Sequence, residues 1–111
     1  MINLKNKVQL IGRLGQNPEI KYFEGGKKLA VFSIATNEPY RNKKGETVDQ
    51  TTWHKVTAWG NTANILEKYV TKGQQILVNG KLQNRTYNDK NGVTHYVTEI
   101  MANEIQMFGR A

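Results

Sequence analysis

The sequence contains no cysteine and no long apolar run. The lack of cysteine excludes a disulfide framework, a cysteine-ligated zinc site and a cysteine nucleophile. No apolar run approaches the ~20 residues that span a bilayer. The first residues, MINLK, also lack the charged region followed by an apolar stretch that marks a signal peptide. We therefore expect a cytoplasmic protein that makes no contact with a membrane.

Acidic residues are scarce, because 9 Asp and Glu stand against 16 Lys and Arg, giving a net charge of +7. Such an excess of cations favours an anionic partner, of which nucleic acid is the commonest. Hydrophobic residues make up 38% of the 111 residues, which is enough for a core and argues against disorder. We expect one domain over residues 1–111, with a core small enough that self-association would usefully bury more surface.

Apolar patterning predicts mostly strands, over residues 7–14, 19–22, 28–36, 50–59, 75–87 and 93–101, with 103–108 as a candidate last strand. Apolar residues at helical spacing predict one helix over 61–70, with Asn61 or Thr62 as its N-cap. The polar residues 37–49 predict a long hairpin loop, and residues 88–92 predict a tight turn.

Glycine interrupts two of these strands, at Gly12 and Gly80, as the corners of a small closed sheet require. Five main strands with a helix between the third and fourth is the layout of an oligonucleotide-binding barrel. We therefore predict an all-β fold, a five-stranded oligonucleotide-binding (OB) barrel with one short helix between strands 3 and 4.

Residues 52–60, TWHKVTAWG, carry the most informative pattern. Because a strand alternates its faces, one face holds Trp53, Lys55, Thr57 and Trp59. The opposite face holds His54 beside two apolar residues and is the core side. Two indoles beside an ammonium favour base stacking, worth ~1–3 kcal/mol per base, with the cation neutralising phosphate. The alternative is that either ring packs under a loop.

Aromatic residues also stand among cations elsewhere, near residues 40–44, 85–90 and 21–28. Single strands need this combination, since rings stack on bases and cations neutralise the backbone. For Tyr22 simple surface packing is an equally good interpretation. The predicted DNA contacts are Tyr40, Trp53, Trp59, Tyr87, Lys55, Arg85, Arg41, Lys43, Lys44 and Tyr22.

Catalysis is the main competing class, because two histidines and a lysine can in principle cleave RNA by acid–base chemistry. Strand alternation, however, points His54 away from Lys55, and no third residue orients either His54 or His95. The acidic residues show neither paired nor metal-ligand spacing. We therefore predict no catalytic residue, no metal and no cofactor.

Taken together, these motifs resemble the bacterial single-stranded DNA-binding proteins over nearly the whole chain. The matching segments are 6–15 (NKVQLIGRLG), 17–22 (NPEIKY), 35–36 (AT), 51–54 (TTWH), 59–60 (WG), 68–73 (KYVTKG), 78–80 (VNG), 85–87 (RTY) and 106–109 (QMFG). The resemblance implies an OB barrel that binds and protects single-stranded DNA in replication, recombination and repair, at the nucleoid. It places the stacking rings at Tyr40, Trp53, Trp59 and Tyr87.

This chain departs from the family pattern at several positions. Tyr40 and Tyr87 stand where the family often has Trp, Trp59 where it often has Phe, and Thr52 where it often has Glu. The family typically continues into a flexible linker and an acidic tip that recruits replication and repair enzymes. This sequence stops at Ala111 without such a tip, either because it is a trimmed piece or because this is a tailless member. The resemblance therefore does not carry that recruitment over.

The resemblance also implies a homotetramer built as a dimer of dimers. In it the first strand pairs or packs with its copy and His54 lies near a subunit contact, unless His54 is an ordinary core histidine. The candidate interface residues are His54, Lys7, Val8, Gln9 and Leu10.

Three other functions stay open for a chain of this kind. One is a tailless primosomal replication protein of the same barrel family, which would use fewer rings. Another is an OB barrel that serves only as a protein-interaction module, and the third is an RNA-binding barrel. The four well-placed rings favour single-stranded DNA.

Overall fold

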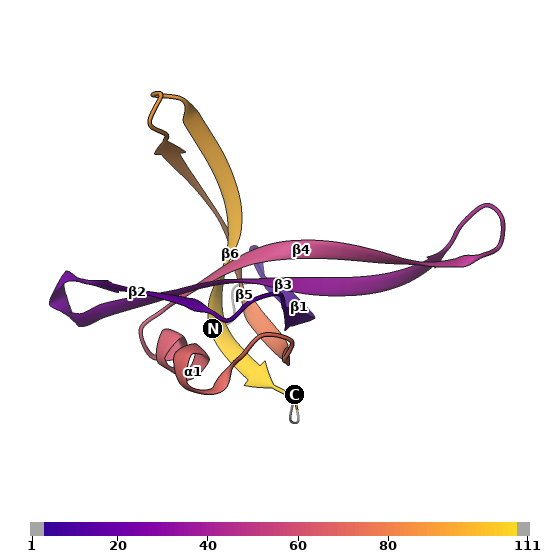
Figure 1. Cartoon of the computed structure of the whole chain (residues 1–111), viewed down its shortest axis with the longest axis horizontal. Coiled ribbons are helices and arrows are strands. Elements are labelled where there is room, and N and C mark those ends of the chain that lie inside the picture. The colour runs from indigo at the N-terminus through magenta and orange to yellow at the C-terminus, as the bar shows by residue number, and fades with distance from the viewer. Residues whose placement is uncertain (1–3, 109–111) are drawn as a thin grey trace.

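The computed structural model describes residues 4–108. Gly109 of the last family motif and the C-terminal Ala111 lie outside the described residues, as do residues 1–3. The elements in chain order are β1 (Val8–Leu14), β2 (Glu19–Phe23), a short 3-10 turn (Glu24–Gly26), β3 (Lys27–Arg41), β4 (Thr47–Trp59), α1 (Asn61–Tyr69), β5 (Gln75–Asn88) and β6 (Thr94–Met107) (Figure 1).

The strands form one sheet in the order β1-β5-β6-β4-β3-β2, and an additional pairing between β1 and β3 closes it. Closure is made where Arg13 lies opposite Ala35 and Leu14 opposite Ile34. The closed ring therefore contains β1, β5, β6, β4 and β3, while β2 is added at the edge of β3. The predicted five-stranded OB barrel is confirmed, with α1 between its third and fourth strands, β4 and β5.

The core lies inside this ring, and α1 closes one end of it. The largest fully buried side chains are Ile34, Leu66, Ile76, Val56 and Val78. The predicted N-caps of α1 are wrong, because Gly60 with φ 63° occupies that position and no side chain caps it. A backbone turn at Gly60 lets β4 run directly into the helix, and Thr62 instead donates to the carbonyl of Asn103 (3.4 Å).

The two predicted corner glycines are places of close strand approach. A Cβ atom on Gly12 would lie 2.6 Å from the carbonyl oxygen of Ala35, and one on Gly80 would overlap the carbonyl of Met101. The pairing of β5 with β6 shifts register between Asn79 and Gly80. This bulge lets β6 bend without ending, so the predicted division into strands 93–101 and 103–108 is wrong.

The predicted loop over residues 37–49 is also wrong, because most of it is paired strand. β3 and β4 stay in register from Asn37 opposite Thr51 out to Arg41 opposite Thr47. Residues 37–51, the β3–β4 arm, project beyond the barrel, as does the β5–β6 arm, residues 84–98 (Figure 1). The arms raise the radius of gyration to 16.1 Å, above the roughly 13 Å typical of a compact chain of this size.

Both arms end in the same kind of turn. Oδ1 of Asn42 accepts hydrogen bonds from the backbone N–H groups of Lys44 (2.9 Å) and Glu46 (3.0 Å). Oδ1 of Asp89 accepts the equivalent pair from Asn91 (2.9 Å) and Val93 (3.0 Å). Each turn is thus fixed by one side-chain oxygen, as in an Asx-turn.

Candidate nucleic-acid interface

Strand β4 presents two exposed indoles on its outer face. Trp53 is 59% exposed and Trp59 is 43% exposed, whereas Val56 and Ala58 on the other face are fully buried. Lys55 lies between the two rings, on the same face by strand alternation. Exposed indoles beside a cation offer a surface on which unpaired bases can stack.

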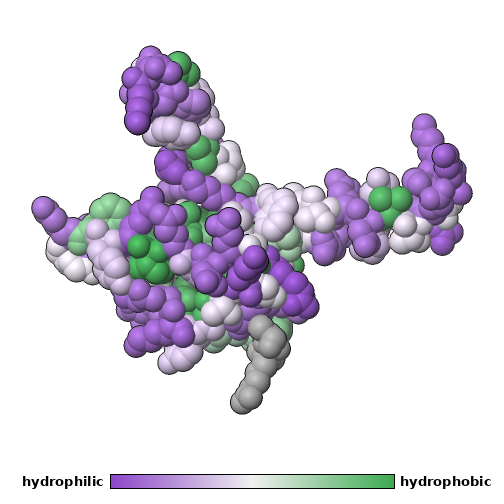
Figure 2. Space-filling view, viewed as in Figure 1, coloured by the Kyte–Doolittle hydropathy of each residue, from purple (hydrophilic) through white to green (hydrophobic). Residues whose placement is uncertain are grey.

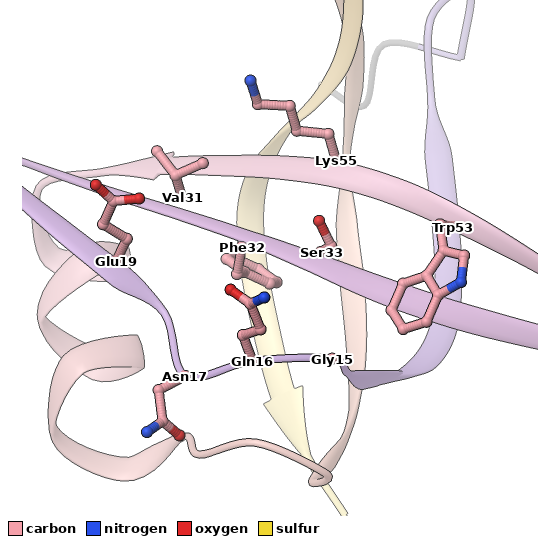
Figure 3. A pocket seen from close by; sticks show the side chains of 9 residues that line it. All are labelled: Gly15, Gln16, Asn17, Glu19, Val31, Phe32, Ser33, Trp53 and Lys55. Atoms are coloured by element: carbon pink, nitrogen blue, oxygen red, sulfur yellow. The ribbon is translucent and has the colours of Figure 1, made fainter.

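Trp53 closes one end of a hollow of about 540 Å³ (Figure 3). Its ring hangs over the segment that joins β1 to β2, where Gly15 supplies no side chain and so leaves room for it. The hollow is also lined by polar and apolar side chains, and Lys55 stands at its rim (Figure 3). These lining residues are Gln16, Asn17, Glu19, Val31, Phe32 and Ser33. The size suits a base lying against the indole.

Trp59 lies at the far end of β4, beside an aromatic residue that the sequence pattern did not single out. The rings of Phe23 and Trp59 have centroids 5.5 Å apart and are tilted by 41°. Phe23 comes from the last position of β2 and is 47% exposed. Little in the sequence indicated a role for Phe23, because the residue ends a short edge strand and no motif surrounds it. Lys27 and Lys28 line a hollow of about 390 Å³ against Trp59.

Arg85 and Lys55, predicted on separate strands as phosphate contacts, converge on one buried carboxylate. Nε of Arg85 donates to Oε1 of Glu99 (3.1 Å), and Nζ of Lys55 lies 3.9 Å from Oε2. These three residues line a hollow of about 320 Å³ together with Trp59. The β4 face and the β5–β6 arm therefore form one continuous surface.

Tyr87 extends this surface along the β5–β6 arm. Its ring stacks on that of His95, with centroids 5.0 Å apart and an interplanar angle of 17°, and Cζ of Arg85 lies 5.7 Å from the Tyr87 ring centre. Nε2 of His95 lies 2.8 Å from Oδ2 of Asp89. From the sequence His95 stood out only as a candidate catalytic group, whereas in the structure its ring supports that of Tyr87.

Of the other predicted contacts on the β3–β4 arm, Tyr40 faces away from this surface, whereas Arg41 lies near the tip on the same face as Trp53. Tyr40 is 49% exposed, but regular pairing of β3 with β4 places it on the face of the β3–β4 arm opposite Trp53. Arg41 ends β3, and Lys43 and Lys44 lie in the turn at the tip of the same arm. Figure 2 shows both arms as mainly hydrophilic.

Tyr22 lies apart from the other predicted rings. Its hydroxyl donates to Oε2 of Glu67 on α1 (2.7 Å), and Lys28 donates to Oε1 of the same carboxylate (2.7 Å). The hydrogen bond to Glu67 raises the pKa of Tyr22, and the bonds from Lys28 and Tyr22 lower the pKa of Glu67. Strand alternation puts Tyr22 on the face of β2 opposite Phe23.

Apart from His54, the candidate interface residues lie in β1 or directly before it. That strand pairs with β5 from Val8 to Arg13 on one side, but on the other side it pairs with β3 only at Arg13 and Leu14. From Val8 to Ile11, no strand among residues 4–108 covers the second edge. His54 is half-buried on β4, and its Nε2 lies 3.0 Å from the hydroxyl oxygen of Thr36.

Among the described residues, 4–108, no group of three or more His, Cys, Asp or Glu side chains is placed to hold a metal ion. No helix in that part of the chain is long and apolar enough to cross a membrane.

Comparison with known proteins gives one consistent family. Residues 5–108 match the model of the single-strand binding protein family. The chain is 42% identical over 106 residues to Single-stranded DNA-binding protein 1 of Xylella fastidiosa, covering 95% of this chain and 78% of that protein. It is 39% identical over 104 residues to the Single-stranded DNA-binding protein of Neisseria meningitidis serogroup A, covering 94% of this chain and 60% of that protein.

A solved structure, the Plasmodium falciparum SSB complex with ssDNA, superposes with a TM-score of 0.87 at 33% identity, covering 98% of this chain and 99% of that one. The fold, the exposed rings and the match over residues 5–108 all indicate the same family. The chain belongs to the single-strand binding protein family.

Proposed function

We propose that this protein binds and protects single-stranded DNA without sequence preference, and that it is not an enzyme. The observation that carries the proposal is the pair of exposed indoles, Trp53 and Trp59, on one face of β4 with Lys55 between them. Every base has a π-face, so stacking on a ring does not select a sequence. In a duplex those faces are covered by neighbouring base pairs and cannot reach the rings.

The proposed path of the strand follows the surfaces that carry rings and cations. From the hollow at Trp53 it passes Lys55 to Trp59, and from there it continues onto the β5–β6 arm at Arg85 and Tyr87. Tyr40 lies on the opposite face of the β3–β4 arm. A strand that uses it as well must pass around that arm, which is a wrapping path.

We also propose that the protein assembles into a homotetramer, a dimer of dimers, through β1. The uncovered edge of β1 from Val8 to Ile11 supports this, because a strand edge left unpaired can add the same strand of another copy. The candidate contacts are Lys7, Val8, Gln9, Leu10 and His54. Two copies of β1 would bury Val8 and Leu10 further, since both are only half-buried in the single chain.

The biological setting follows from the partner. Single-stranded DNA is exposed during replication, recombination and repair, so we place the protein in the cytoplasm at the nucleoid. The chain spans 60% of the length of its Neisseria relatives. We therefore propose that any recruitment of replication and repair proteins by this chain uses the surface of the barrel.

Fluorescence anisotropy with labelled oligo-dT, the matching duplex and oligo-U tests the proposed function. We expect oligo-dT to bind much more tightly than the duplex, with an affinity that falls steeply as salt rises. Equal affinity for the duplex would contradict the stacking surface. Preference for oligo-U would assign the barrel to RNA, and no binding to any of them would leave a protein-interaction module.

A further inference from the structure

An acidic side chain lies at the floor of the basic surface. Glu99 comes from β6, and its side chain is only 3% exposed. It is placed between Lys55 and Arg85, two of the cations proposed to neutralise phosphate. A negative charge at this point repels DNA, and burying it costs free energy unless it is well paired. Its presence therefore requires a reason other than charge.

The pairing of Glu99 is incomplete. Oε1 accepts the Nε–H of Arg85 at 3.1 Å. Oε2 is buried and has no hydrogen-bond partner among the described residues, and the ammonium of Lys55 stays 3.9 Å from it. A carboxylate kept only for stability would have both oxygens satisfied, because an unsatisfied buried acceptor is costly. The position of Glu99 is therefore explained by its contacts with the two cations rather than by stabilisation of the core.

The contact through Nε fixes Arg85 in a particular way. A guanidinium is planar and carries five N–H groups in a rigid fork. Holding the Nε–H fixes that plane and leaves the terminal nitrogens, which have no hydrogen-bond partner within residues 4–108. The side chain is 41% exposed, so these free donors can bind two oxygens of one phosphate, as guanidinium groups commonly do.

We propose that Glu99 is a positioning residue, whose buried carboxylate orients Arg85 so that the guanidinium grips one phosphodiester of single-stranded DNA beside Trp59. The inference rests on the proposed function. The phosphodiester lies over the hollow that Lys55, Trp59, Arg85 and Glu99 line. Lys55, held nearby by the second carboxylate oxygen, faces the same phosphate.

A positioning role for Glu99 and a simple charge effect predict opposite changes in DNA affinity when the charge is removed. If Glu99 only weakened the positive field, every variant without its charge would bind DNA more tightly. If Glu99 positions Arg85, a variant that cannot accept the Nε–H binds more weakly although the protein has gained positive charge. A variant that keeps an acceptor oxygen without the charge binds at least as tightly as the natural protein.

The test compares Glu99→Gln and Glu99→Leu by anisotropy with labelled oligo-dT. We expect Glu99→Gln to bind at least as tightly as the natural protein, and Glu99→Leu to bind roughly tenfold more weakly, the size of one charge-assisted hydrogen bond. Glu104→Leu on the same strand removes an equal charge from an exposed side chain that bonds Asn79, away from the hollow. It should not weaken binding.

The dependence on Arg85 is tested in an Arg85→Ala background, where Glu99→Leu should cause no further loss. A loss that persists there, or a Glu99→Leu protein that binds as tightly as the natural one, would overturn the inference. If Glu99→Leu does not fold by circular dichroism, Arg85→Lys replaces it. That variant keeps the charge and the ion pair but lacks the fork, and unchanged affinity would then overturn the inference. Failure of the natural protein to bind oligo-dT refutes the proposed function itself.

Discussion

The indole of Trp53 lies so close to Gly15 that a methyl group on Gly15 would come within 2.6 Å of the ring carbon Cζ3. Gly15 does not need a left-handed backbone, so its small size is what matters here. The linker between β1 and β2 thus makes room for a ring that stays 59% exposed. The position of that ring, and with it the hollow beside it, depends on a residue that has no side chain.

A methyl group on Gly15 should therefore weaken DNA binding without unfolding the barrel. Gly15→Ala would displace the Trp53 ring and cost part of the ~1–3 kcal/mol that one stacked base contributes. Binding to oligo-dT and thermal melting check this. Pro18→Ala, in the same linker but outside the lining of the hollow, is the matched control, and an equal loss in both variants would contradict a role for Gly15 in placing the ring.

Removing the rings themselves should weaken binding more. Trp53→Ala and Trp59→Ala should each cost roughly 1–3 kcal/mol of binding free energy for each base stacked on them. Tyr69→Ala on α1 removes a ring that is 62% exposed but belongs to no proposed contact. Oligo-dT affinity should be unchanged in that control, and losses as large as those of the tryptophan variants would mean that exposed rings act non-specifically.

Salt dependence should report the cations at the tip of the β3–β4 arm. The log–log slope of affinity against salt is about −0.7 for each phosphate neutralised on a single strand. Replacing Arg41, Lys43 and Lys44 by Ala should therefore reduce the slope by about 2. A triple variant with the natural slope would place the strand away from this tip.

The turn of the β5–β6 arm should loosen in acid. The hydrogen bond from His95, followed by those from the backbone N–H groups of Val93 and Asn91, lowers the pKa of Asp89 below its usual value near 3.8. Because the folded pKa is depressed, this stabilisation is present above the ordinary pKa and is lost as pH falls through the lower folded value. The amide chemical shift of Val93, followed by NMR from neutral pH downward, should report the change below about pH 4. Asp89→Asn keeps the acceptor oxygen and should abolish that titration.

Assembly should depend on His54. Its imidazole bonds Thr36 at 3.0 Å and is half-buried in the single chain, so a bulkier His54→Tyr side chain should disturb a neighbouring subunit more than its own barrel. We expect light scattering to show a tetramer for the natural protein and smaller species for the variant, with folded barrels by circular dichroism. A monomeric natural protein, or a variant that stays tetrameric, would contradict this.

The parts of the fold that have a buried side were predictable from sequence. Strand alternation placed Trp53 and Trp59 on the exposed face of β4 and Val56 in the core, and the structure agrees. The β3–β4 arm was missed because neither of its faces is buried. Without a core side, the apolar alternation that signals a strand disappears, and Pro39 and Gly45 suggest a loop instead.

The site residues that the sequence did not predict are those whose role depends on contacts between strands far apart in the chain. Glu99 joins β6 to Lys55 on β4 and Arg85 on β5, and no spacing along the chain encodes this convergence. The ring contact of Phe23 with Trp59 depends on β2 pairing with β3 and β3 with β4. Such neighbours appear only once the strand order is known.

The most direct test of the account is the emission of each tryptophan while single-stranded DNA binds. Trp59→Phe leaves Trp53 as the only indole, and Trp53→Phe leaves Trp59, so each ring can be followed alone. Titration of each variant with oligo-dT at low salt should quench its emission strongly, while the matching duplex should leave it nearly unchanged. If oligo-dT binds and neither indole changes its emission, bases do not lie on this face and the proposed binding surface is wrong.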